Sequence, residues 1–278
     1  MTRTKAVGLS TAFLVSGFAV GYSLIGAIGT LLWRDEMPGL TEAAAVQSAV
    51  LLPVFALATW IFGIRLARLG PTELRWRGRP GDSLRGLAIG AVPAAIVMLA
   101  AVPLAGAGWS RDGGSFVAWL GTLPGLILVL FPAALLEEVI FRGVPLVLLA
   151  AAFGRPAALV VTATLFGLLH ALNPDVTPLA IGNVALAGVF LGVAFYLPGG
   201  LWTATGAHLG WNLTHAVLAA PVSGLPFTMP WLDYRPGGPA WLSGGSFGPE
   251  GGILATVVLA VTVALAARYL EPNQESFA

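Results

Sequence analysis

Long apolar stretches recur along the whole chain, separated by short breaks rich in glycine, proline and charged residues. About 20 consecutive apolar residues suffice for a helix to cross a bilayer, so this pattern predicts membrane-spanning helices rather than a water-soluble core. We expect an all-α, polytopic integral membrane protein with about eight transmembrane helices, the fourth of which can continue to about residue 151. The predicted spans are 8–32, 43–64, 86–107, 117–141, 157–172, 178–197, 201–220 and 251–270.

The composition agrees with a membrane protein. Hydrophobic residues make up 57% of the 278 residues and charged residues only 10%, whereas about a quarter of a soluble domain is charged. A net charge of +1 gives no electrostatic basis for binding nucleic acid. The absence of cysteine excludes disulfides, thiolate nucleophiles and thiolate metal ligands. We therefore expect residues 1–278 to form a single membrane domain in contact with the lipid bilayer.

The basic residues predict the orientation of the chain. With an uncleaved first span and the N-terminus inside, ten of the 14 basic residues lie on the inner side and three on the outer side, with Arg142 left in a span. Positive charge favours the cytoplasmic side, so both termini are expected to be cytoplasmic in a prokaryotic cell (inner) membrane. The segment 221–250, rich in Pro, Gly and Trp, is then an extracytoplasmic loop that packs on the membrane surface.

Two adjacent acids interrupt the fourth span. Glu137 and Glu138 lie inside an otherwise apolar segment, whereas the other acidic residues, Glu250 among them, fall in loops, at span ends or near the termini. A charge at the bilayer centre costs roughly 2.5–3.5 kcal/mol on insertion scales, and such residues usually mark a functional site. The pair is therefore a candidate site.

Spacing distinguishes the two glutamates. Glu138 and Arg142 are four residues apart, so they can form an ion pair on one helix face. Glu137 points about 100° away, has no such local partner in the sequence, and could hold a water molecule and act as a base. The alternative is a purely structural ion pair at a helix end, with Glu137 solvated at the cytoplasmic interface.

All three histidines follow the glutamates in sequence. His170 ends the fifth predicted span, and His208 lies in the seventh, four residues before Asn212. An imidazole and an amide on one face can donate hydrogen bonds to a developing oxyanion. A glutamate with two histidines could also bind zinc, or activate water without a metal. His215 lies on the same stripe as His208, and we assign it a structural role.

Three short motifs thus occur in order on separate apolar segments. They are Glu137-Glu138-x-x-x-Arg142, Phe166-x-x-x-His170 and His208-x-x-x-Asn212. Together they resemble the CPBP intramembrane proteases, the CAAX protease and bacteriocin-processing (ABI) family that includes the CAAX prenyl endopeptidases. The resemblance covers about residues 117–220, which we take as the catalytic motif core.

The resemblance implies a role for each motif residue. Glu137, helped by His170, would activate the attacking water, and His208 with Asn212 would stabilise the tetrahedral intermediate. If the enzyme is a metalloprotease, Glu137, His170 and His208 are the candidate zinc ligands; the resemblance also allows a metal-independent glutamate protease.

The supporting residues complete the predicted site. Glu138 with Arg142 would fix the glutamate helix, and Phe166 would pack beside the site. The resemblance implies a catalytic cavity between the fourth, fifth and seventh helices, in which a membrane-embedded or membrane-associated protein or peptide is cut. The sequence does not identify that substrate or show that it is prenylated. A non-catalytic immunity or scaffold protein of the same family and a proton- or ion-coupled transporter are the alternatives.

Overall fold

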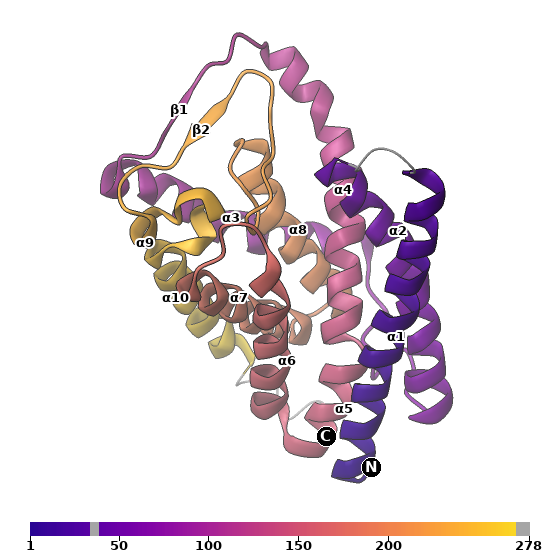
Figure 1. The fold of residues 1–278 in the computed structure, drawn as a ribbon. Helices are drawn as coiled ribbons and strands as arrows, with labels where there is room; N and C mark the ends of the chain where they lie inside the picture. The colour runs from indigo at the N-terminus through magenta and orange to yellow at the C-terminus, as the bar shows by residue number, and fades with distance from the viewer. Residues whose placement is uncertain (34–38, 271–278) are drawn as a thin grey trace. The chain divides into compact units, whose positions relative to one another are not determined.

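The computed structural model describes residues 1–33 and 39–270 (Figure 1). It is 76% helical, which confirms the predicted all-α class. The only extended pairing between named strands in this part of the chain joins β1 (Gly108–Ser110) to β2 (Asp233–Arg235), which run antiparallel. The helices are α1 (Arg3–Leu32), α2 (Leu40–Ala58), α3 (Pro80–Ala105), α4 (Phe116–Arg142), α5 (Val144–Phe153), α6 (Arg155–Leu169), α7 (Pro178–Tyr196), α8 (Leu201–Val217), α9 (Ala240–Ser243) and α10 (Ile253–Leu270).

All eight predicted apolar segments form helices, but they differ in length. Within the described ranges, six helical segments are long and apolar enough to cross a membrane. The predicted seventh span corresponds to α8, of 17 residues, and the predicted eighth to α10, of which Ile253–Arg268 counts as a shorter apolar helix. The 17 residues of α8 extend only about 25 Å at 1.5 Å per residue, less than a hydrocarbon core of about 30 Å. The six qualifying segments are Arg3–Leu32, Glu42–Leu66, Gly81–Ala105, Phe116–Phe153, Arg155–Leu172 and Pro178–Tyr196.

The fourth apolar segment continues beyond the glutamates, as the sequence predicts. α4 ends at Arg142 and α5 begins at Val144, so one apolar segment extends from Phe116 to Phe153. The two helices are separated at Gly143, where a Cβ atom would meet the carbonyl oxygen of Val139. The break therefore requires glycine, and Pro145 follows in the first turn of α5, a position where its missing N–H is tolerated.

The chain folds into two compact units. Unit 1 comprises residues 1–77 and 128–162, and unit 2 comprises residues 78–127 and 163–278. The division falls within α4 and within α6.

The core of unit 1 forms where α1 packs on α2. Phe13 and Phe55 are fully buried, and their rings meet edge to face at 5.3 Å. Gly17 of α1 leaves the space that the Phe55 ring fills, since a Cβ atom there would collide with that ring. At the start of α1, Arg3 donates a hydrogen bond of 3.3 Å to the carbonyl oxygen of Ala152. The beginning of α1 therefore lies beside the end of α5.

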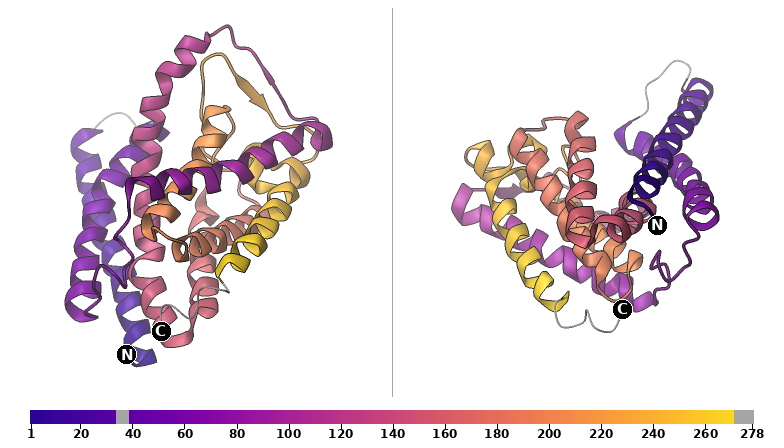
Figure 2. Two further views of the ribbon diagram at one scale, coloured as in Figure 1. Left: turned by 180° about the vertical axis from the view of Figure 1, so that it is seen from behind. Right: turned by 90° about the horizontal axis from the view of Figure 1, so that it is seen from below.

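In unit 2, α3 crosses α8 at very short range (Figure 2). Cβ atoms added at Gly86 and Gly90 of α3 would meet backbone atoms of α8, and those added at Gly206 and Gly210 of α8 would meet backbone atoms of α3. Small residues spaced four apart let helix backbones approach closely in membranes. This packing is the principal contact that holds the His208 helix.

The long segment after α8 folds back onto unit 2. Phe247 and Glu250 are only 1% and 6% exposed, so this part is more deeply packed than the surface loop that the sequence predicts. Its extracytoplasmic location remains a prediction. Near β2, burial raises the pKa of Tyr234 to about 12, and its ring lies 5.5 Å from that of Trp109. The phenol therefore stays neutral at physiological pH.

The contact between α3 and α8 predicts that Gly90→Ala destabilises the protein. The new methyl group would meet the backbone carbonyl of Ala207, which cannot rotate away, so a loss of about 1–3 kcal/mol is expected. The measurement is thermal unfolding of the purified protein in detergent. Gly182→Ala in α7, where a Cβ atom meets nothing within 4 Å, is the control; equal stability of the two variants would contradict the prediction.

Candidate functional site

Glu138 and Arg142 form a buried ion pair on α4. Arg142 Nη1 lies 3.2 Å from Glu138 Oε1, and the two side chains are 1% and 0% exposed. The pairing predicted from their four-residue spacing is therefore confirmed. Two charges taken out of water are tolerated only when they compensate each other, and removal of one partner leaves an uncompensated buried charge. The pair thus ties the end of α4 to its own preceding turn.

Glu137 differs from its neighbour in exposure. It is half-buried, whereas Glu138 is fully buried. Adjacent helical residues point about 100° apart, so the two carboxylates leave α4 in different directions. A general base must be reachable by the water that it deprotonates. Of the two glutamates, Glu137 meets that requirement better.

His170 lies where α6 ends and a single 3-10 turn, η2 (His170–Leu172), begins. Its Nδ1 is 2.8 Å from the carbonyl oxygen of Phe166. Because a carbonyl oxygen only accepts hydrogen bonds, Nδ1 carries the proton, and Nε2 of the neutral ring offers a lone pair. The half-buried imidazole is thereby fixed in the tautomer that suits a base or a metal ligand.

The Phe166 ring contacts both motif histidines of unit 2, His170 and His208. Its ring centroid lies 4.7 Å from that of His170 and 5.9 Å from that of His208. His208 is only 7% exposed, and Asn212, one turn further along α8, is half-buried. The structure therefore brings the second and third motifs together within unit 2, and it places the glutamate motif in unit 1.

The motif-bearing segment of the chain matches a known protein family. Residues 119–214 match the family described as Rce1-like, type II CAAX prenyl endopeptidase Rce1-like. This segment is therefore similar to the type II CAAX prenyl endopeptidases. The match begins in α4, ends in α8 and includes every motif residue from Glu137 to Asn212. No curated protein and no solved structure matches the chain.

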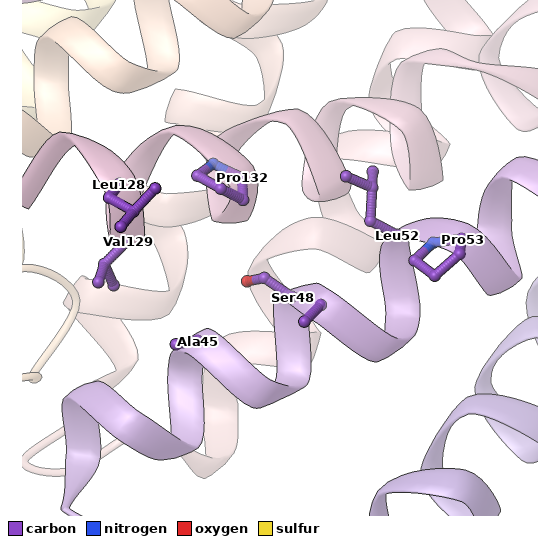
Figure 3. Close-up of a pocket in the computed structure, with 8 residues that line it drawn as sticks. Ala45, Ser48, Leu52, Pro53, Leu128, Val129 and Pro132 are labelled. Atoms are coloured by element: carbon purple, nitrogen blue, oxygen red, sulfur yellow. The ribbon is translucent and has the colours of Figure 1, made fainter.

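A cavity of about 220 Å³ lies in unit 1, between α2 and α4. Its lining is apolar or small, apart from the Ser48 hydroxyl (Figure 3). Val129 and Pro132 line it from α4, one to two turns before Glu137. No motif residue lines this cavity, so it is separate from the candidate site. The predicted catalytic cavity between the fourth, fifth and seventh helices remains a prediction.

Zinc binding depends on a third ligand. Among the described residues, no group of three or more His, Asp or Glu side chains is arranged to hold a metal ion. His170 and His208 of unit 2 would supply two ligands, and catalytic zinc sites use three protein ligands. A bound zinc ion would acidify its water and polarise the carbonyl. Glu137 as the third ligand stays a prediction.

Sequence reasoning missed a polar cluster around Glu250. This acid follows a Pro/Gly-rich stretch and was expected to be a loop residue without a role, yet it is buried against α8. Its partners Trp211 and Ser223 are 39 and 27 residues away. Because no helical or strand period links such distant positions, the sequence contains no signal for the cluster.

The buried pair predicts a large effect of Glu138→Gln on stability. Neutralising Glu138 removes the carboxylate that pairs with the buried Arg142 guanidinium, with an expected loss of about 3–5 kcal/mol. Thermal unfolding in detergent measures it. Glu138→Gln/Arg142→Gln should recover part of that loss, because the buried guanidinium charge is removed as well. A double variant no more stable than the single one would contradict the pairing as the cause.

If the three candidate ligands bind zinc, the purified protein should contain about one zinc ion per chain. Glu137→Gln and His170→Ala should each lower the zinc content, measured by elemental analysis, and chelation should abolish cleavage. Cleavage that persists in chelated, zinc-free protein would contradict the metal site and leave the glutamate and histidines as the catalytic groups.

Proposed function

We propose that the protein is an intramembrane endopeptidase that hydrolyses a peptide bond in a membrane-embedded or membrane-associated protein or peptide. The observation that carries the proposal is the family match, which includes all three motifs within residues 119–214. The apolar helices on either side of the motifs support a reaction within the membrane.

In the proposed reaction, Glu137 and His170 activate one water molecule. The water oxygen attacks the scissile carbonyl carbon while Glu137 accepts its proton, and the tetrahedral intermediate forms. Glu137 then passes a proton to the leaving amine nitrogen as the C–N bond breaks. The half-buried position of Glu137 and the available Nε2 of His170 support these roles.

His208 and Asn212 are proposed to stabilise the oxyanion. Each can donate a hydrogen bond, and one well-placed donor contributes about 3–4 kcal/mol to the transition state. Burial of His208 supports this role, because a donor shielded from water interacts more strongly with a developing charge. Glu138 and Arg142 act indirectly, since their ion pair fixes the helix that carries Glu137.

The protein is multi-pass, and we propose that it lies in a prokaryotic cell membrane with both termini in the cytoplasm. Arg3 at the start of α1 contacts the end of α5, and Arg155 follows two residues after α5 ends. Lys5 and Arg155 are exposed. This end of unit 1 is therefore basic, as expected for the side that faces the cytoplasm.

Replacing Glu137 by Gln should abolish cleavage without unfolding the protein. The amide cannot accept the proton of the attacking water, and loss of a general base costs about 100- to 10,000-fold. The measurement compares new peptide N-termini in membranes that contain the parent or the variant. A segment cut only in the presence of the parent identifies the substrate, and His170→Ala and His208→Ala should also leave it uncut.

Glu42→Gln is the control, because Glu42 is an exposed acid at the start of α2 that bonds to the Gly39 backbone N–H. It should cut at the parental rate. Unchanged cleavage by folded Glu137→Gln would contradict the mechanism. If even the parent cuts nothing but binds a membrane protein, the chain is an immunity or scaffold protein; ion flux that depends on Glu137 would indicate a transporter.

A further inference from the structure

The buried carboxylate of Glu250 joins two segments that are distant in the sequence. Glu250 lies in the 3-10 turn η4 (Pro249–Gly251) and is 6% exposed. Its Oε2 accepts a hydrogen bond of 2.8 Å from the indole Nε1–H of Trp211 on α8. Its Oε1 accepts the backbone N–H of Ser223. One side chain thus holds α8 and the turn after it together.

The turn at Ser223 extends this chain of hydrogen bonds to the segment that follows His170. The Ser223 carbonyl oxygen accepts a bond of 2.8 Å from Asn173 Nδ2. Asn173 follows directly after η2, three residues beyond His170. The turn is closed by a bridge between Val222 and Leu225, so its N–H and its carbonyl are held in fixed directions.

On the α8 side, the contact falls within the third motif. Trp211 lies between His208 and Asn212 in the sequence and is buried. The His215 ring packs 5.2 Å from the Trp211 ring, and its Nδ1 donates to the Trp211 carbonyl oxygen at 2.9 Å. The indole that donates to Glu250 is therefore held in place by its own helix.

The turn that carries Glu250 is itself anchored. Asn183 of α7 donates from Nδ2 to the carbonyl oxygens of Glu250 and Gly252, at 2.8 Å each. Its Oδ1 accepts a bond from the Thr256 hydroxyl. These hydrogen bonds hold the backbone at Glu250 in place, so the carboxylate has a fixed position.

We propose that Glu250 is a positioning residue, which sets the His170 segment relative to the His208 and Asn212 helix through Ser223 and Trp211. The proposal rests on the proposed peptidase function for its effect on catalysis. Glu250 lies outside the segment that matches the family.

An acid is required here for a chemical reason. Trp211 and Ser223 each present an N–H donor, and a carboxylate accepts from both with charge-assisted bonds that are stronger than neutral ones. A glutamine amide has one oxygen and one NH₂ group, so one of the two buried donors would lose its acceptor. Glu250→Gln thus removes one link while nearly preserving the side-chain volume.

Hydrogen exchange tests the positioning role without a substrate. In Glu250→Gln, amides of residues 166–173 or 204–216 should exchange about tenfold faster, the factor expected for one lost buried hydrogen bond. Amides of α1 and α2 should be unchanged. Faster exchange confined to residues 221–225 would mean that Glu250 merely closes a loop, and would overturn the proposal.

Activity gives the second readout. In Glu250→Gln, kcat per folded protein should fall by about tenfold or more, because a 1 Å misplacement of a catalytic group can cost about 100-fold, while KM changes little. Asp112→Ala is the matched control: Asp112 also accepts hydrogen bonds from two backbone N–H groups of unit 2, that of the nearby Gly114 and that of the distant Trp231. It should change neither kcat nor exchange at the two histidine segments.

Two further variants separate the links. Asn173→Ala should speed amide exchange in residues 166–173 alone, and Trp211→Phe should speed it in residues 204–216 alone. The two variants therefore test the proposal even if Glu250→Gln does not fold. Protection of both segments in both variants would overturn it. A parent protein without peptidase activity would contradict the proposed function but leave the exchange result standing.

Discussion

The membrane is the constraint on which the rest of this structure depends, because a spanning helix offers an ionised side chain no bulk water. The chain meets that constraint in α4 by pairing Glu138 with Arg142 at 3.2 Å in a fully buried position. A compensated pair can remain in an apolar segment where a single charge could not. Glu137, one residue earlier and half-buried, is carried on a helix turn that the pair holds in a fixed conformation.

Unit 2 meets the same constraint by providing hydrogen-bond donors for the polar backbone groups at the end of α8. The end of this helix exposes backbone carbonyls that require donors, and the indoles of Trp119 and Trp109 donate to Val217 and Leu218 at 2.8 Å each. The glycines of α3 and α8 allow the two backbones to touch, so packing holds α8 despite its polar residues. The helix that carries His208 is therefore held by the indole hydrogen bonds at its end and by its packing against α3.

Most of the fold could be predicted from the sequence, because apolar runs and four-residue spacings are local signals. They located the helices, the continuation of the fourth segment to about residue 151 and the pairing of Glu138 with Arg142. The reduced length of α8 was missed, since its apolar run continues past Val217 where the helix ends. The role of Glu250 was missed as well, because its contacts depend on how the chain folds back and not on any periodicity.

The most direct measurement is mass spectrometry of the cleavage product formed by the purified protein in lipid vesicles, in water enriched in oxygen-18. Hydrolysis by activated water predicts that the new carboxyl terminus carries the heavy isotope with the parent protein, and that Glu137→Gln forms no product. An intact substrate segment in the presence of folded parent protein, or labelled product formed equally well by Glu137→Gln, would contradict a glutamate-dependent peptidase.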